Sequence, residues 1–289
     1  MTKKFTITEV ENLTGIKTAT LRIWEKRFNF SNPERVNGNR YYTLEDLELL
    51  INISQLKDNG YPISKLALLN VKTIFEKISQ LYHNDDKFRS AINGLIISMF
   101  CVDIYDFENH LNRYFNLFGV PNTLEKIVIP FLDKINFLNE TKPYNEVLIA
   151  LTTIRRKIIY CIESLDFNRN AEQSAVFFLP KNEQFDLILL YVCYVLKSQG
   201  YKTLYLGTNI PEENIMIILK QNKPDHLFTY VTHEDNFNMT LMLTYIQELH
   251  PGQVLNVLTS NKTTLALNAK TELINFMCCQ QLTQQMLYA

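Results

Sequence analysis

The spacing of apolar residues changes near residue 168, and no other feature of this chain constrains its folding as strongly. Before this point, apolar side chains recur every three or four residues, which is the spacing of α-helices that pack along one face. After it, short β-branched and aromatic runs alternate with helical segments, as in a parallel sheet covered by helices. At 289 residues, the chain is long enough for two or three domains. The sequence therefore predicts a multidomain protein, first α and then α/β.

The region after residue 168 is predicted to form a doubly wound parallel sheet. Its expected strands are residues 175–179, 202–206, 227–231 and 254–258. Its expected helices are residues 185–199, 211–221 and 238–249. Because each helix falls between two strands, we expect the strands to run in parallel and the helices to cover both faces of the sheet.

The first residues carry the start and stop signals of two short helices. Thr6 followed by Glu9 is a capping box, and Gly15 ends the helix that the box begins. Lys17-Thr18 is placed to cap a second helix directly afterwards. Two short helices around a glycine turn indicate a helix-turn-helix.

A wing is predicted after these two helices. Asn37-Gly38 lies between two short extended arms, which is the strongest local signal for a two-residue hairpin. Thr43, with Asp46 three residues on, then starts a third helix that stops at Asn59-Gly60. The N-terminal segment therefore predicts a winged helix-turn-helix.

Charge and side-chain type indicate that this segment meets a polyanion. Residues 1–42 carry eight Lys and Arg against four Asp and Glu, a net charge of +4, whereas the whole chain has −1. A helix that opens with short polar side chains and carries an arginine can enter the major groove of DNA, and a wing can rest on the flanking backbone. The residues expected to contact DNA in this way are Lys17, Thr18, Thr20, Arg22, Arg40 and Tyr42. The alternative is a plain packing unit of two helices.

Several motifs of this segment resemble the DNA-binding domain of MerR-type transcription regulators, over about the first 70 residues. They are Thr14-Gly15-Ile16, Thr20-Leu21-Arg22-Ile23-Trp24-Glu25-Lys26-Arg27, Gly38-Asn39-Arg40-Tyr41-Tyr42-Thr43-Leu44-Glu45-Asp46-Leu47 and Gly60-Tyr61-Pro62-Ile63. The resemblance implies a winged helix that binds a pseudo-palindromic promoter as a dimer. Its contact positions correspond to Arg22, Trp24, Arg27, Arg40 and Tyr42. For Trp24, the alternative is an aromatic residue of the core.

The rest of the chain resembles the helical cap and cobalamin-binding domain of light-sensing CarH and LitR regulators, over about residues 85–289. The motifs that carry this resemblance are Gly119-Val120-Pro121, Thr153-Ile154-Arg155-Arg156-Lys157 and the run from Gln199 to Pro211. We expect a winged-helix domain over residues 1–75, a helical linker and bundle over 76–168, and a cobalamin-binding-like α/β domain over 169–289. Breaks between the bundle helices are expected near 119–121 and 141–143.

The residues that hold cobalamin in that family are replaced in this chain. The family's cobalt-ligating histidine corresponds to Phe185, and a phenylalanine has no lone pair to give a metal. The replaced positions are Phe137, Val147, Leu148, Phe185 and Tyr230. We therefore expect a module without cobalamin, in which the side chains of Leu148 and Phe185 are buried and fill the former cavity.

No motif for catalysis or a structural metal is present in the sequence. It lacks the serine-hydrolase, P-loop, dinucleotide and zinc-protease signatures. Its five cysteines contain no Cys-x-x-Cys pair and are expected to be reduced. His226 and His233 flank a predicted strand whose carboxyl end could bind a ligand or metal, and the alternative is a solvated loop.

These observations predict a transcriptional regulator, not an enzyme. Its expected partners are double-stranded promoter DNA, further copies of the same chain and an unknown small molecule. No apolar run approaches the roughly 20 residues needed to cross a membrane, so we expect a cytoplasmic location. Two other hypotheses stay open: a cobalamin-dependent light-sensing repressor, and an enzyme or carrier related to cobalamin methyl-transfer modules.

Overall fold

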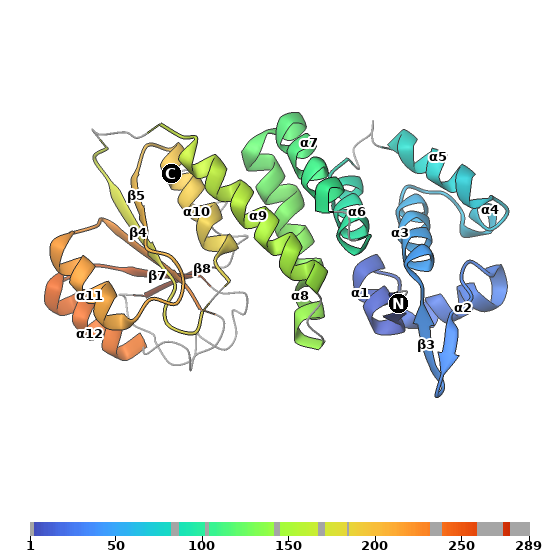
Figure 1. Ribbon diagram of the computed structural model, residues 1–289, viewed down its shortest axis with the longest axis horizontal. Coiled ribbons are helices and arrows are strands. Elements are labelled where there is room, and N and C mark those ends of the chain that lie inside the picture. Colours follow the sequence, from blue (N-terminus) through green and yellow to red (C-terminus); the bar gives the residue numbers. More distant parts are fainter. Residues whose placement is uncertain are drawn as a thin grey trace. The chain divides into compact units, whose positions relative to one another are not determined.

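The computed structural model (Figure 1) divides the chain into two compact units, Met1–Ile154 and Arg155–Ala289. The residues that it describes are 3–81, 87–101, 104–141, 145–166, 171–183, 185–231, 239–258 and 274–277. The domain boundaries at 75 and 168 stay predictions, because the first unit contains both the N-terminal helices and most of the bundle.

The first unit begins with the helices and strands of a winged helix-turn-helix. Its elements are β1 (Phe5–Thr6), α1 (Ile7–Thr14), α2 (Thr18–Phe28), β2 (Glu34–Val36), β3 (Asn39–Tyr42) and α3 (Leu44–Asp58). The expected capping box of α1 is present: the Glu9 amide donates to Thr6 Oγ1 at 3.3 Å, and the Thr6 amide donates to Glu9 Oε2 at 2.6 Å. Gly15 then ends α1 in the left-handed conformation, at φ 77°.

The helix α2 is capped from outside its own sequence. The prediction that Lys17-Thr18 would cap it is wrong, because Lys17 is the N-cap and makes no side-chain cap bond. Instead, the Thr18 amide donates to Glu11 Oε2 of α1 at 3.0 Å. The turn at Gly15 brings Glu11 alongside this orphan amide, so α1 and α2 are joined by a charge-assisted hydrogen bond.

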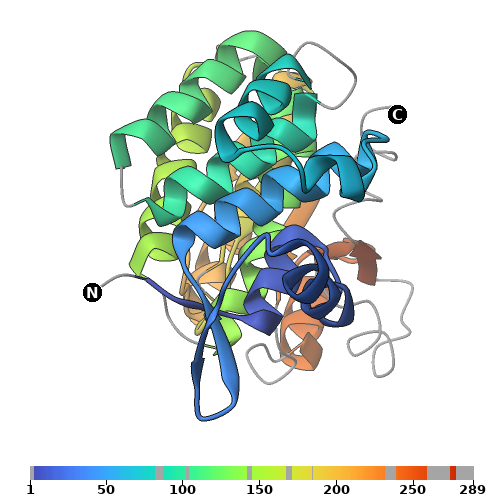
Figure 2. The same ribbon diagram turned by 90° about the vertical axis from the view of Figure 1, so that its right-hand side faces the viewer.

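The wing is a three-stranded antiparallel sheet in the order β1-β3-β2. Asn37 and Gly38 turn the hairpin at φ 50° and 82°, and positive φ at both positions is what a type I′ turn requires. The hairpin extends away from the helices of this unit (Figure 2). The predicted wing is thus confirmed.

The remainder of the first unit is helical, as the sequence predicts. Its elements are α4 (Ile63–Leu66), α5 (Val71–Leu81), α6 (Lys87–Phe100), α7 (Ile104–Thr123), the π-helical segment η1 (Leu124–Val128), α8 (Ile129–Thr141) and the first part of α9 (Asn145–Glu163). Gly119 interrupts α7 at φ 75° and ψ 166°, which confirms the first expected break. The second falls on residues 142–144, outside the described residues. The π-helical segment was not expected.

Polar contacts join the winged helix to the bundle within this unit. Lys134 Nζ of α8 donates to the Leu13 carbonyl at 3.0 Å and so caps the C-terminal end of α1. Burial lowers the pKa of this lysine, and the nearby Arg89 lowers it further. Ser54 Oγ of α3 donates to the Thr14 carbonyl at 3.1 Å. Both contacts fix the end of α1 that leads into α2.

The second unit holds a five-stranded parallel sheet in the order β5-β4-β6-β7-β8. Its strands are β4 (Ser174–Phe178), β5 (Lys202–Tyr205), β6 (His226–Tyr230), β7 (Leu255–Leu258) and β8 (Ile274–Met277). Four of them match the predicted strands to within one residue, whereas β8 was not predicted. In chain order this arrangement is 2-1-3-4-5, a doubly wound order with its switch point between β4 and β6.

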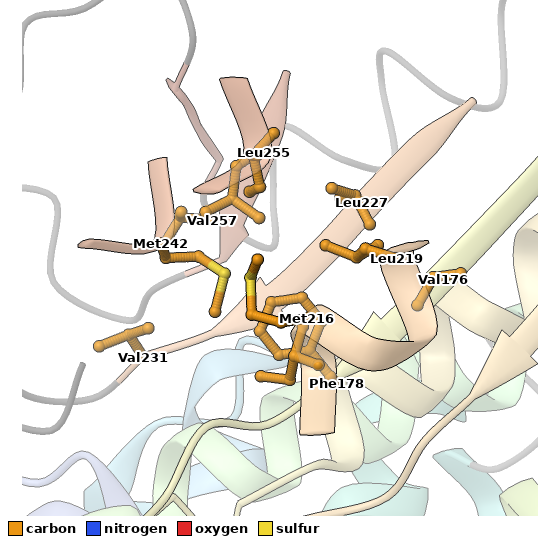
Figure 3. Packing of buried hydrophobic residues seen from close by; sticks show 11 residues of the cluster. Val176, Phe178, Met216, Leu219, Leu227, Val231, Met242, Leu255 and Val257 are labelled. Carbon is orange, nitrogen blue, oxygen red and sulfur yellow. The ribbon is translucent and has the colours of Figure 1, made fainter. Parts of the chain in front are cut away.

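Helices cover both faces of this sheet. They are α10 (Leu187–Ser198), α11 (Glu212–Gln221) and α12 (Met239–Leu249), with α10 on the opposite side from the other two (Figure 1). Met216 of α11 and Met242 of α12 pack against strand residues such as Val176 and Val257 in a buried core (Figure 3). The predicted doubly wound fold is confirmed. Among the described helices, none combines the length and apolar character that crossing a bilayer requires.

Candidate nucleic-acid interface

The helix α2 presents a cationic face to solvent. Arg22, Lys26 and Arg27 are exposed, and so is Arg35 of the wing. Within the described part of the chain, none of these four cations forms an ion pair. Their charge is therefore available to a polyanion.

The beginning of α2 carries the other predicted contact residues. The side chain of Lys17 is 81% exposed and lies 3.1 Å from Glu11 Oε1. Because so exposed an ion pair contributes little, it leaves the lysine able to reach a phosphate. Thr18 and Thr20 are half-buried at the same end of the helix. These residues and Arg22 lie together on the segment that the sequence assigns to the groove.

Trp24 belongs to the core of the winged helix. It is 5% exposed, and its ring meets that of Phe30 edge-on, with the centroids 5.8 Å apart. The core alternative therefore holds, and the prediction that Trp24 touches DNA is wrong, because the ring has almost no free surface. Trp24 and Leu21 instead anchor the inner face of α2 and leave its cations outside.

Glu25 ties α2 to the wing, and the sequence analysis missed it. Arg40 Nε donates to Glu25 Oε2 at 2.9 Å, and the hydroxyl of Tyr42 donates to Glu25 Oε1. The side chains of Glu25 and Arg40 are only 11% and 19% exposed. One signal pointed to this role: Glu25 is the single acidic residue of α2 and stands among its cations.

This arrangement changes the roles predicted for Arg40 and Tyr42. Tyr42 is fully buried, so its assignment as a DNA contact is wrong. Burial raises the pKa of its hydroxyl, and the bond to Glu25 raises it further. The tyrosine stays protonated and donates to Glu25. Arg40 forms an ion pair with the same carboxylate, and this contact orients its guanidinium group on β3.

A second candidate site lies at the switch point of the parallel sheet, beyond the carboxyl ends of β4 and β6. Doubly wound sheets bind their ligands at this place. Here the rings of Phe185 and Tyr230 lie with centroids 6.0 Å apart; Phe185 is half-buried and Tyr230 is buried. The next residue, Asp186, is buried, accepts a hydrogen bond from Tyr205 at 2.5 Å and pairs with Arg155 Nη2 at 2.7 Å.

These residues do not fit a histidine-ligated cobalamin. The phenyl ring of Phe185 offers no donor atom, and the neighbouring carboxylate of Asp186 is already held by Arg155 and Tyr205. Among the described residues, no three His, Cys, Asp or Glu side chains converge to hold a metal ion. His226 lies beside the rings of Tyr201 and Phe228, and His233 falls outside the described residues.

The positions that correspond to the helical cap of the cobalamin-binding regulators differ in their exposure to solvent. Val147 is buried in α9. Leu148 is 54% exposed, so the prediction that its side chain is buried in a refilled cavity is wrong. It follows Val147 directly and lies about 100° further around α9, on the side exposed to solvent. The side chain of Phe137 lies outside the described residues.

Comparison with known proteins agrees with this architecture. Residues 5–69 match the family described as MerR HTH family regulatory protein. The chain is 23% identical over 223 residues to the HTH-type transcriptional repressor CarA of Myxococcus xanthus, covering 76% of this chain and 73% of that protein. It is 35% identical over 66 residues to the HTH-type transcriptional regulator MlrA of Escherichia coli K12, covering 22% of this chain and 27% of that protein.

The fold also resembles that of a solved corrinoid protein. The monomethylamine corrinoid protein of Methanosarcina barkeri superimposes with a TM-score of 0.51 at 13% sequence identity, covering 69% of this chain and 94% of that chain. At this identity the likeness concerns the fold alone. Taken with the winged helix and its cationic face, these matches identify residues 5–69 as a MerR-type helix-turn-helix domain and support a DNA-binding transcriptional regulator.

Proposed function

We propose that this protein is a cytoplasmic transcriptional regulator that binds promoter DNA as a dimer or higher oligomer, with α2 in the major groove and the wing on the flanking backbone. The observation that carries the proposal is the set of unpaired cations on α2 and the wing, Arg22, Lys26, Arg27 and Arg35. Lys17, Thr18 and Thr20 would meet the groove at the start of α2. Phosphate contacts of this kind provide affinity, and the side chains that reach base edges provide specificity.

The oligomer follows from how little DNA one copy can read. One recognition helix contacts a few base pairs, and regulators of this construction gain affinity and specificity by placing two such helices one helical turn apart. The rigid tie through Glu25 would keep the wing at a constant offset from α2, so that both copies present the same footprint.

For the second unit, we propose a role in assembly or sensing without cobalamin and without catalysis. Phe185 and the Arg155–Asp186–Tyr205 cluster at the switch point support this reading. The alternative, a cobalamin-dependent light-sensing repressor, is favoured by the fold shared with a corrinoid protein.

Two experiments test the proposal. Hydroxyl-radical footprinting on the DNA upstream of the protein's own gene should show two protected half-sites one helical turn apart, and a lack of protection at every protein concentration would contradict the proposal.

The second experiment tests for cobalamin. Protein mixed with adenosylcobalamin in the dark should elute from gel filtration without a corrin absorption band. A band that co-elutes with the protein would favour the light-sensing alternative.

A further inference from the structure

A pocket lined by both polar and apolar side chains lies in the first unit, beside the helix that follows the wing. It has a volume of about 310 Å³ and is bounded by α3, α5, α6 and α7. This volume falls at the small end of the range of roughly 300 to 1,000 Å³ that is usual for ligand sites. Three lining residues, Glu48, Asn52 and Gln55, come from one face of α3 at a spacing of four and three residues.

Asn52 supplies the observation that points to a ligand. Asn52 is 4% exposed, yet among the residues that the structure describes its amide nitrogen Nδ2 has no hydrogen-bond partner. A buried amide donor that stays unpaired has lost its hydrogen bonds to water without replacement, which is unfavourable. Because Asn52 lines the pocket, an acceptor atom of a bound molecule would satisfy this donor.

The polar groups next to Asn52 are already fixed in place. Asn93 Nδ2 donates to Gln55 Oε1 at 2.9 Å, and Gln55 Nε2 donates to Ser90 Oγ. Gln55, Ser90 and Asn93 are all buried. This network therefore fixes the side chains on the pocket wall formed by α3 and α6. Asn52 differs from these neighbours because its amide nitrogen is unpaired in the described structure.

The charge of the lining defines which ligand fits. Two carboxylates, Glu48 and Asp106, line the pocket, and none of its described lining residues is Lys or Arg. Burial raises the pKa of Glu48, and the neighbouring Glu45 raises it further. Asp106 lies 3.4 Å from His110, which also lines the pocket and contacts Tyr114. A cationic group would offset the acidic charge of the half-buried Glu48 and the exposed Asp106, whereas an anion would add to it.

We propose that this pocket binds a small hydroxylated or amide-bearing amine, with an acceptor oxygen on Asn52 Nδ2 and the ammonium group near Glu48. The ligand would contact α3 directly. Since Ser54 of the same helix holds the Thr14 carbonyl at the end of α1, ligand binding would bear on the helix pair that the proposed function places on DNA. Only this last consequence rests on the proposed function.

The test uses three sugars of one scaffold that differ in charge: glucosamine, glucose and glucuronate. In isothermal titration calorimetry with the full chain, glucosamine should bind at millimolar concentrations, roughly tenfold more tightly than glucose, and glucuronate should not bind. An absence of glucosamine binding, or equal binding of all three sugars, would overturn the proposal.

Two variants and a control place the ligand. Asn52→Leu removes the unpaired donor and should abolish glucosamine binding, while Glu48→Gln should remove the preference for glucosamine over glucose. Asn214→Leu, at an exposed position of α11, should bind as the unaltered protein does. Binding that survives both pocket substitutions would overturn the assignment. Sugar binding is measured without DNA, so its failure is distinct from a failure of DNA binding.

Discussion

Arg22 and Tyr42 lie in the same small domain, but the exposed Arg22 is placed to contact DNA, whereas the buried Tyr42 stabilises the fold. Arg22 is exposed and unpaired in the described structure, whereas Tyr42 is buried and bonded to Glu25. We expect Arg22→Ala to weaken operator binding by about 1 to 3 kcal/mol, since it removes a base or phosphate contact. Electrophoretic mobility shifts would measure this. Arg113→Ala, which removes an exposed arginine from α7, should leave the affinity unchanged, and equal effects of the two variants would contradict the groove assignment.

Glu25 holds two wing residues with one carboxylate, so its removal should be costly. We expect Glu25→Ala to lower the free energy of unfolding by about 2 to 3 kcal/mol, because it leaves a shielded arginine and a buried hydroxyl without their acceptor. Urea unfolding followed by the fluorescence of Trp24, the single tryptophan, would report on this domain. The matched control is Glu34→Ala, which breaks only the exposed pair with Lys4 and should cost less than about 1 kcal/mol. A loss of unfolding free energy no larger than that of the control would contradict a stabilising role of the Glu25 contacts with Arg40 and Tyr42.

The thiol of Cys193 makes stability depend on alkaline pH. Burial raises its pKa to about 11, whereas a cysteine in an unfolded chain ionises near pH 8.5. The unfolded state therefore loses its proton first, and stability should fall between about pH 8.5 and pH 11 by up to roughly 1.4 kcal/mol per pH unit. In urea titrations at several pH values, Cys193→Val should lack this part of the decline. Cys101→Val, at an exposed position, should retain it; a decline of the same size in all three proteins would argue against the buried thiol.

Single residues were the hardest feature to predict from the sequence. The exposed Arg22 and Arg27 follow from helical periodicity, because Leu21 and Trp24 mark the inner face of α2. The role of Glu25 does not follow, since its partners lie 15 and 17 residues away across the hairpin. The exposure of Leu148 likewise depends on what packs against α9, which local spacing does not reveal.

At the scale of elements, the wing offers the sharpest comparison. Gly38 turns the hairpin at φ 82°, and no atom lies within 4 Å of the position that a Cβ would occupy. Gly38→Ala should therefore cost about 1 to 2 kcal/mol of backbone strain and also weaken DNA binding, because the strain falls on the wing. Gly252→Ala adds the same strain at φ 85° in the second unit, also in open space. Gly252→Ala should lower stability to a similar extent and leave the affinity for DNA unchanged. Equal losses of DNA affinity in the two variants would contradict a role of the wing in DNA binding.

Most elements could be predicted because their signals are local. The capping boxes at Thr6 and Thr43 set the starts of α1 and α3, and Asn37-Gly38 sets the hairpin. The strand β8 was missed because it is defined by its pairing with β7, from Leu255 opposite Ile274 to Leu258 opposite Met277. The cap that Glu11 provides for α2 was missed for a similar reason: it requires the turn to be folded first.

At the scale of the whole molecule, the proposed function places DNA binding on the first unit and no catalysis on the second. The parallel sheet keeps the order and switch point of a ligand-binding fold. Its switch point, however, carries the Phe185–Tyr230 pair and a carboxylate already bound by Arg155. The sequence could predict this loss of donor atoms, since Phe185 stands where the resemblance expects a histidine. It could not predict the internal network, which joins α9, β5 and the loop before α10.

The central claim is that cations on α2 and the wing bind duplex DNA, and its salt dependence tests this most directly. Fluorescence anisotropy would measure the affinity of the full chain for a labelled duplex from its own upstream region over a range of salt concentrations. If four cations of each copy contact phosphates, the logarithm of the binding constant of a dimer should fall by roughly 7 per tenfold increase in salt. Affinity that does not change with salt, or no affinity for any duplex, would contradict the account.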